Sequence, residues 1–250
     1  PNSIDFGNRD YIAALDKSIK GMRIGFTPDF GIFPVEPEIA RMCEAAAKRF
    51  EDAGAIVEQA TFDFKRSAFE LAEAWDRMIT ISGGLGTIEE FKAGGIDLLR
   101  DHADDLPDEL IYWVEDAYKR GYVDFHDGEV IRTEVFDQIQ GAFQDYDLLL
   151  SPTLACHPVK NDANRNTVGP SMINGVKTEP LIGFCLTFFC NFTGNPAASI
   201  PAGLSGDGFP VGLQLIGNRY GERDLLSASA AYERVNPWAA DYEVTKNRTL

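Results

Sequence analysis

The sequence predicts an α/β fold in which helices are layered on a mixed β-sheet. Residues 22–59 follow the order strand, helix, strand, which is the pattern of a parallel crossover unit. Residues 145–153 (DYDLLLSPT) contain a short apolar run that Pro152 ends, as in a buried strand. Residues 191–217 follow the order loop, strand, turn, strand, with glycine or proline at each corner, as in a hairpin.

The crossover unit contains clear start and stop signals. Residues 22–26 (MRIGF) form a short apolar strand. Pro37 stands where a helix would begin, because the first turn of a helix does not need its missing N–H. Apolar residues then recur at helical spacing up to Phe50, and Gly54 ends the helix. Residues 55–59 are expected to form the second strand.

The middle of the chain is predicted to be helical. Ser67 and Glu70 form a capping box at the start of a helix over residues 67–82, which Gly83 and Gly84 are expected to break. The other expected helices cover residues 10–18, 107–121, 123–144, 180–190 and 222–235. Residues 155–178 are rich in Pro, Asn and Gly and are expected to form a surface loop.

The hairpin near the C-terminus has an unusual glycine. Pro196 leads into a first strand of small residues at 197–200, and residues 211–216 form the second strand. Gly212 lies inside that second strand, where a glycine often marks the close approach of another backbone or a ligand. An ordinary buried hairpin is the simpler interpretation of the same pattern.

Composition indicates one compact unit over residues 1–250. The chain is 44% hydrophobic and 25% charged, as in proteins that bury a sizeable core, and it contains no internal repeat. Its formal net charge of −16 argues against nucleic acid or an anionic membrane as a direct partner, because both would repel it. Its apolar runs are too short or too broken to span a bilayer.

Cysteine and histidine usage predicts neither a disulfide framework nor a metal centre. The four cysteines form no CxxC pair, and the sequence lacks a signal-peptide pattern, so we expect reduced thiols in a cytoplasmic protein. The three histidines, His102, His126 and His157, have no ligand-like spacing. No metal and no cofactor are therefore expected.

Several stretches together resemble the C-terminal half of amidase signature family enzymes. They are the run NFTGNPA from Asn191, the following PAG, the run GFPVGLQLIG that ends at Gly217, the segment DYDLLLSPT, and residues 22–58. The resemblance covers nearly the whole chain. It implies an α/β/α sandwich-like fold and hydrolysis of a carboxamide or related C–N bond through an acyl-serine intermediate.

The catalytic residues of that family are not found in this chain. The resemblance implies two serines and a lysine in a serine- and glycine-rich stretch of the N-terminal half, and Gly83-Gly84 does not replace that stretch. Ser151 and His157 could be combined with a carboxylate, but no G-x-S-x-G elbow surrounds Ser151. We expect a processed chain whose partner is the N-terminal half, as a separate chain or a missing segment. A homo-oligomer stays open.

The resemblance also implies residues that line a substrate pocket. Leu181, Phe184 and Phe188 correspond to pocket positions at one-turn spacing and are expected to share a helical face, and Trp75 lies on a helix that often reaches the substrate. Each of these residues could instead belong to the core. The A-type subunits of glutamyl-tRNA amidotransferases have an aspartate where Phe184 stands, so an apolar or aromatic amide is favoured here.

Two alternative functions remain open at this point. An amidotransferase A-type subunit would transfer ammonia to an acceptor, which a hydrolase does not do. A non-catalytic binding remnant of the family would have lost its catalytic half.

Overall fold

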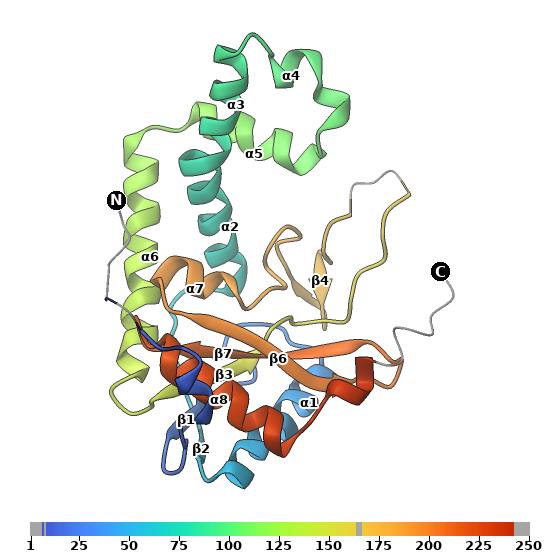
Figure 1. Cartoon of the computed structure of the whole chain (residues 1–250). Coiled ribbons are helices and arrows are strands. Elements are labelled where there is room, and N and C mark those ends of the chain that lie inside the picture. The colour runs from blue at the N-terminus through green and yellow to red at the C-terminus, as the bar shows by residue number, and fades with distance from the viewer. Residues whose placement is uncertain (1–6, 8, 164–166, 243–250) are drawn as a thin grey trace.

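The computed structural model describes residues 7, 9–163 and 167–242. A five-stranded sheet with the order β2-β1-β3-β7-β6 lies at its centre (Figure 1). Its strands are β1 (Arg23–Phe26), β2 (Ile56–Gln59), β3 (Leu148–Pro152), β6 (Ala197–Leu204) and β7 (Pro210–Gly217). Strand β1 is parallel to β2 and β3, whereas β7 is antiparallel to β3 and β6. The predicted fold class is therefore confirmed.

The crossover unit forms as predicted. Helix α1 (Pro37–Lys48) has proline in its first turn and continues into a 3-10 turn over Arg49–Ala53. Gly54 ends that turn with a φ of 88°, a left-handed conformation that glycine adopts without a steric penalty. The chain then enters β2, which pairs with β1 in parallel register from Arg23–Ile56 to Phe26–Gln59.

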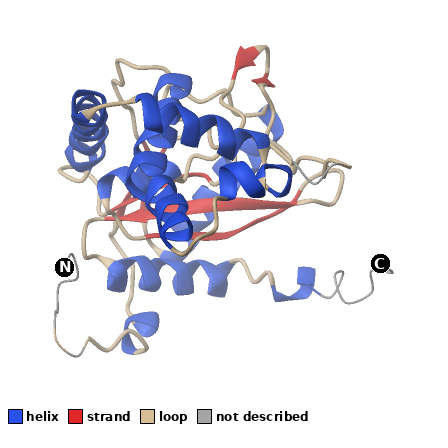
Figure 2. Ribbon diagram, turned by 90° about the horizontal axis from the view of Figure 1, so that it is seen from above, coloured by secondary structure: helices blue, strands red, loops and turns tan. Residues whose placement is uncertain are grey.

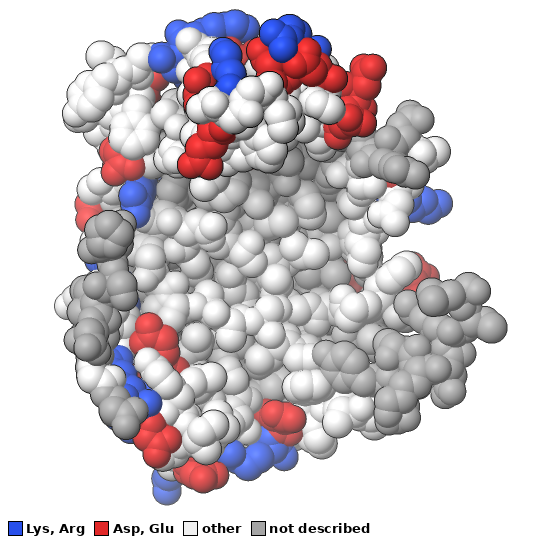
Figure 3. Space-filling model, turned by 45° about the horizontal axis from the view of Figure 1, so that its top comes forward, with Lys and Arg blue, Asp and Glu red and all other residues white. Residues whose placement is uncertain are grey.

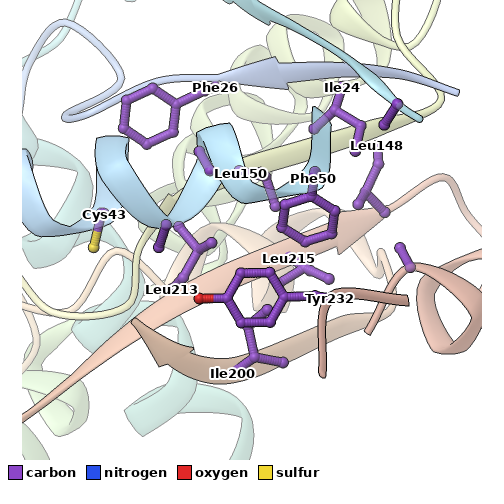
Figure 4. Packing of buried hydrophobic residues seen from close by; sticks show 14 of the residues in the cluster. Ile24, Phe26, Cys43, Phe50, Leu148, Leu150, Ile200, Leu213, Leu215 and Tyr232 are labelled. Atoms are coloured by element: carbon purple, nitrogen blue, oxygen red, sulfur yellow. The ribbon is translucent and has the colours of Figure 1, made fainter. Parts of the chain in front are cut away.

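Helices cover both faces of the sheet (Figures 1 and 2). Helices α1 and α8 (Glu222–Val235) pack on one face, where Leu148, Leu150 and Leu213 meet Phe50 and Tyr232 (Figure 4). The opposite face is covered by α2 (Ala68–Ile79), α6 (Tyr122–Ala142) and α7 (Phe188–Thr193). Leu148 and Leu150 of β3 lie in the core on one face of the sheet, and Leu149 between them lies in the core on the other face, because strand side chains alternate between the two faces.

The helical region between β2 and β3 extends away from the sheet (Figure 1). It contains α2, α3 (Leu85–Ala93), α4 (Leu98–Asp101), a 3-10 turn (Ala103–Asp105), α5 (Asp108–Lys119) and α6. The prediction that Gly83 and Gly84 break the helix is wrong. A π-helical turn over Thr80–Gly84 joins α2 to α3, and both Gly84 and Leu85 keep right-handed helical dihedral angles.

Three further expectations need correction. Residues 10–18 contain only a 3-10 turn, Ala13–Asp16. The loop over 155–178 contains a small hairpin of β4 (Met172–Ile173) and β5 (Val176–Lys177). The expected helix over 180–190 is wrong in its first part, because residues 180–184 form turns and α7 begins only at Phe188.

The C-terminal hairpin is longer than its sequence pattern indicated. Strand β6 continues past Pro201 to Leu204, with an irregularity in its pairing with β7 between Pro201 and Gly203. A final 3-10 turn covers Ala239–Tyr242. No helix within the described ranges has the length and apolar character that crossing a bilayer requires.

Candidate functional site

One face of the molecule is hollowed and largely uncharged (Figure 3). In this view the side chains of Lys, Arg, Asp and Glu gather toward the edges of the face, while its centre is occupied by uncharged residues. A hollow, uncharged surface favours contact with an apolar ligand or with more protein rather than with water alone.

The segment before α7 is a tight turn organised by Glu179. One carboxylate oxygen of Glu179, Oε2, accepts hydrogen bonds from the backbone N–H groups of Leu181 and Ile182, each at 2.8 Å. The Gly183 N–H donates to the Glu179 carbonyl at 2.9 Å. A Cβ at Gly183 would lie 2.7 Å from the Glu179 backbone, so this turn can close only with glycine there.

The same segment is attached to the chain that leaves β3. The Ala155 N–H donates to the Phe184 carbonyl at 2.7 Å, and the Leu186 N–H donates to the Thr153 carbonyl at 3.1 Å. The Phe184 ring lies directly against the backbone at Gly169, where a Cβ would come within 2.2 Å of the ring. These contacts fix the position of Phe184 from two sides.

The structure separates the four predicted pocket residues. Leu181 is 41% exposed and Phe184 is half-buried, and both lie on the turn. Phe188 is 1% exposed and its ring packs against Phe33 at 5.9 Å between centroids, so it belongs to the core. Because the helix begins at Phe188, the expectation that Leu181, Phe184 and Phe188 share one helical face is wrong.

Trp75 lies in a different place, on α2. It is half-buried and lines an open groove of about 350 Å³ between α2, α6 and α7. On the wall of this groove, the Arg132 guanidinium donates from Nε to the Phe192 carbonyl at 2.6 Å. Trp75 and Phe184 both pack against the core cluster on this side of the sheet.

A buried acid that sequence reasoning missed lies next to Trp75. Asp76 is fully buried, and neither of its carboxyl oxygens has a hydrogen-bond partner among the described residues. Burial, together with the neighbouring Glu179 side chain, raises the pKa of Asp76 to about 9. The signal was present in the sequence, since Asp76 falls at four-residue spacing among the buried residues Ala68, Ala72 and Thr80.

Polar side chains form a row across the sheet. Ser151, Gln214 and Ser199 lie opposite one another on β3, β7 and β6. Gln214 donates from Nε2 to Ser151 Oγ at 3.0 Å, and the hydroxyls of Ser199 and Thr153 are 2.8 Å apart. A Cβ at Gly212 would lie 2.7 Å from each of those two hydroxyl oxygens, which accounts for the glycine inside β7.

The residues that could have formed a nucleophile and base do not meet. Ser151 is fully buried and bonded to Gln214, whereas His157 Nε2 lies 3.1 Å from Glu38 Oε2. The cysteines are all free thiols, and burial raises the pKa of Cys43 and of Cys190 to about 12, so neither is a thiolate nucleophile at neutral pH. Within the described part of the chain, no three His, Cys, Asp or Glu side chains gather as a metal site requires.

Comparison with known proteins gives a consistent result. The family model described as Amidase matches residues 5–226. An acylamidase from Rhodococcus erythropolis is 30% identical over 244 residues, which cover 96% of this chain and 47% of the relative. The A-type subunit of a glutamyl-tRNA(Gln) amidotransferase from Lactiplantibacillus plantarum is 29% identical over 90% of this chain and is covered to 47% of its own length.

Among solved structures, a bacterial aryl acylamidase of the amidase signature enzymes is similar over 98% of this chain, with 40% identity and a TM-score of 0.94. A 6-aminohexanoate cyclic dimer hydrolase shares the fold at 21% identity and a TM-score of 0.72. The chain spans 49% of the aryl acylamidase chain, or about half the length of the proteins it matches.

Proposed function

The chain belongs to the amidase family, and from this premise we propose that it forms the substrate-binding half of an amidase. The reaction is hydrolysis of a carboxamide or related acyl C–N bond, other than a peptide bond, through an acyl-serine intermediate. The nucleophile and its base come from residues outside this chain, because Ser151 is buried against Gln214 and is not paired with His157. The proposal requires no metal and no cofactor.

The observation that carries this proposal is the likeness to the aryl acylamidase, at 40% identity over 98% of the chain. Likeness at this level supports a shared reaction class more strongly than the fold alone does. The chain's own residues add support, since the turn at Glu179 carries an exposed leucine, Leu181, and a half-buried phenylalanine, Phe184.

The partner we propose is the remainder of the amidase, as a separate chain or a further segment of the same chain. Strand β6 lies at the edge of the sheet and exposes Ala197 and Ser199. An unpaired strand edge is a ready site for another strand or a covering element. The hollow, uncharged face in Figure 3 would be buried by the same partner. We place this assembly in the cytoplasm, which free thiols favour.

The substrate we propose is an apolar or aromatic amide. Phe184 and Leu181 would contact its apolar part, Phe188 would support Phe184 from the core, and Trp75 would contribute from α2. A wall of ring and aliphatic side chains binds a ligand by burying apolar surface, and it offers no charge to an ammonium group.

The test is an assay of the native protein purified with whatever chain accompanies it. We expect hydrolysis of an anilide such as p-nitroacetanilide and loss of activity after treatment with a serine-directed fluorophosphonate. Phe184→Ala should raise KM for the anilide about tenfold, since every 1.4 kcal/mol of lost binding is a factor of ten. Phe91→Ala, an exposed ring on α3, is the matched control and should leave KM unchanged. Absence of both hydrolysis and labelling would overturn the proposal.

A second candidate is an amidotransferase A-type subunit, which the relative from Lactiplantibacillus plantarum favours at 29% identity. Phe184 counts against it, since a phenylalanine cannot form a charge-assisted hydrogen bond with the ammonium of glutamine. Transfer of ammonia from glutamine to an acylated acceptor would establish this candidate instead. A chain that binds amides without hydrolysing them would be the non-catalytic remnant.

A further inference from the structure

The Asp76 carboxyl group is the most unusual polar group in the described structure. Asp76 lies on α2 and its side chain is fully buried, and both carboxyl oxygens lack a hydrogen-bond donor among the described residues. A charged carboxylate buried without a donor is strongly unfavourable, so such a group keeps its proton and needs an acceptor next to it for the hydrogen bond that this proton makes.

Glu179 is the neighbour able to accept a hydrogen bond from that proton. It is 4% exposed and lies on the turn, where two backbone N–H groups donate to its Oε2 at 2.8 Å, so this oxygen is an acceptor. Glu179 lies next to Asp76, and its charge disfavours the ionised form of Asp76. Because a carboxylate oxygen cannot donate, a hydrogen bond between the two groups requires a proton on one of them. Two carboxyl groups in contact cannot both be ionised without a large penalty, and one retained proton converts their repulsion into a hydrogen bond.

We propose that Asp76 and Glu179 share one proton, with Asp76 as the acid that donates to the Glu179 carboxylate, and that this pair joins helix α2 to the turn bearing Leu181 and Phe184. Both are positioning residues, because they hold the wall of the pocket without forming part of its surface. Trp75 is next to Asp76 in α2, and Phe184 is five residues after Glu179. The pair therefore also fixes the position of Trp75 relative to Phe184.

The surrounding charges are consistent with a neutral Asp76. On α2 itself, Glu73 disfavours the charged form of Asp76 and Arg77 favours it, and one nitrogen of Arg77, Nη2, is bonded to Glu73 at 3.4 Å. On α6, Arg132 donates to the Phe192 carbonyl and is paired with Glu129. On α5, Glu109 has a buried carboxyl oxygen without a partner among the described residues, and an acid of this kind brings no positive charge that would favour an ionised Asp76. Helix α7 contributes only the Cys190 thiol.

The shared proton makes stability depend on pH in a defined direction. In the unfolded chain Asp76 loses its proton near its ordinary pKa of 3.8, whereas in the folded protein burial raises that pKa to about 9. The folded state therefore binds one proton more than the unfolded state between these values. The stabilisation is complete below the unfolded pKa and is lost as the pH rises toward and through the folded pKa.

The first experiment compares unfolding of the native protein with that of Asp76→Asn, whose amide donates to Glu179 without titrating. Relative to this variant, the unfolding constant of the unchanged protein should rise about tenfold per pH unit between about pH 5 and about pH 8. Asp137→Asn, on the exposed face of α6, is the control and should leave the pH dependence unchanged. If the ratio of the unfolding constants of the unchanged protein and Asp76→Asn does not vary with pH, Asp76 is ionised in the folded protein and the proposal is overturned.

Difference infrared spectroscopy gives an independent readout. The native protein should show the C=O stretch of a protonated carboxyl group that disappears only at alkaline pH, and Asp76→Asn should lack this band. Glu179→Gln should lack it as well, because its amide can donate to an ionised Asp76 while its oxygen still accepts from the turn. Retention of the band in both variants would assign the proton to another group and reject the pair.

The role in positioning the pocket rests on the proposed function and is tested separately. In the unchanged protein, KM for an anilide should rise at alkaline pH, where the shared proton is lost. In Asp76→Asn, KM should have the same value at neutral and alkaline pH, because the amide does not titrate. Asp76→Leu should raise KM at every pH with a smaller change in kcat. If the protein hydrolyses no amide, the proposed function fails while the infrared and unfolding results still decide the shared proton. If KM is insensitive to all these variants, the pair does not position the pocket.

Discussion

At the scale of single residues, the absence of a side chain decides which groups can approach one another. The Phe184 ring can lie against the 155–178 segment only because residue 169 is glycine, and the Gly169 N–H donates to the Pro180 carbonyl at 2.7 Å. Gly212 similarly leaves room for the hydroxyls of Ser199 and Thr153 above β7. These contacts are steric, so a single methyl group is enough to test them.

Gly169→Ala should move the Phe184 ring. The new Cβ would lie 2.2 Å from the ring and 2.8 Å from the Pro180 carbonyl oxygen, and backbone on one side leaves little room to adjust. We expect a loss of about 1–3 kcal/mol in the free energy of unfolding, measured by chemical denaturation. Gly141→Ala in α6 is the control, because nothing lies within 4 Å of its Cβ and it should be neutral or stabilising. Equal effects of the two substitutions would contradict this account of Phe184.

At the scale of elements, helix α2 is the structure on which the candidate site depends. It carries Trp75 and Asp76, and it begins at a complete capping box. Ser67 Oγ accepts a hydrogen bond from the Glu70 N–H at 3.2 Å, and the Ser67 N–H donates to Glu70 Oε2 at 2.9 Å. The hydrogen bond from the Ser67 N–H lowers the pKa of Glu70, so the box is fully formed at neutral pH and weakens as the pH falls.

Ser67→Ala should therefore cost about 1 kcal/mol of stability, since one of the first N–H groups of α2 loses its acceptor. Ser67→Asp should restore most of this loss, because aspartate also caps helices well. Ser82→Ala is the control, because the Ser82 side chain is exposed and its hydroxyl donates only to the nearby helix carbonyls of Met78 and Ile79. Its removal should change stability by less than about 0.5 kcal/mol. Thermal or urea unfolding of the three variants measures these differences, and an unchanged Ser67→Ala would show that packing alone fixes the start of α2.

Two helical boundaries show how tertiary contacts override local signals. The pair Gly83-Gly84 has the composition of a helix break, yet the chain stays helical there, where the π-helical turn over Thr80–Gly84 packs against α5. Residues 180–187 have the apolar content of a helix, yet they form turns because Glu179 and the strand extension at Thr153 and Ala155 supply the backbone hydrogen bonds. Neither competing contact is visible from the local sequence.

At the scale of the whole molecule, charge separates the two enzymatic candidates. The formal net charge of −16 repels a polyanion, so we expect no binding of tRNA at physiological ionic strength. Fluorescence anisotropy of labelled tRNA, titrated with the native protein, measures this. Binding that weakens steeply with added salt would indicate phosphate contacts and would favour the amidotransferase candidate over the amide hydrolase.

The sequence by itself determined the fold class, the crossover unit over residues 22–59, the capping box at Ser67 and the hairpin around Gly212. These features depend on hydrophobic period, proline and glycine, which act between residues close in the chain. It also determined the family, because the motifs from Asn191 to Gly217 are themselves continuous in sequence.

Only the tertiary structure decided where the four predicted pocket residues lie and that Asp76 is buried without a hydrogen-bond donor among the described residues. Phe188 is in the core and Trp75 is in a groove, although both fit the same sequence expectation as Phe184. Asp76 and Glu179 are separated by 102 intervening residues in the chain. Whether two such carboxyl groups meet depends on how α2 and the turn pack against the same core, and local sequence carries no information about that contact.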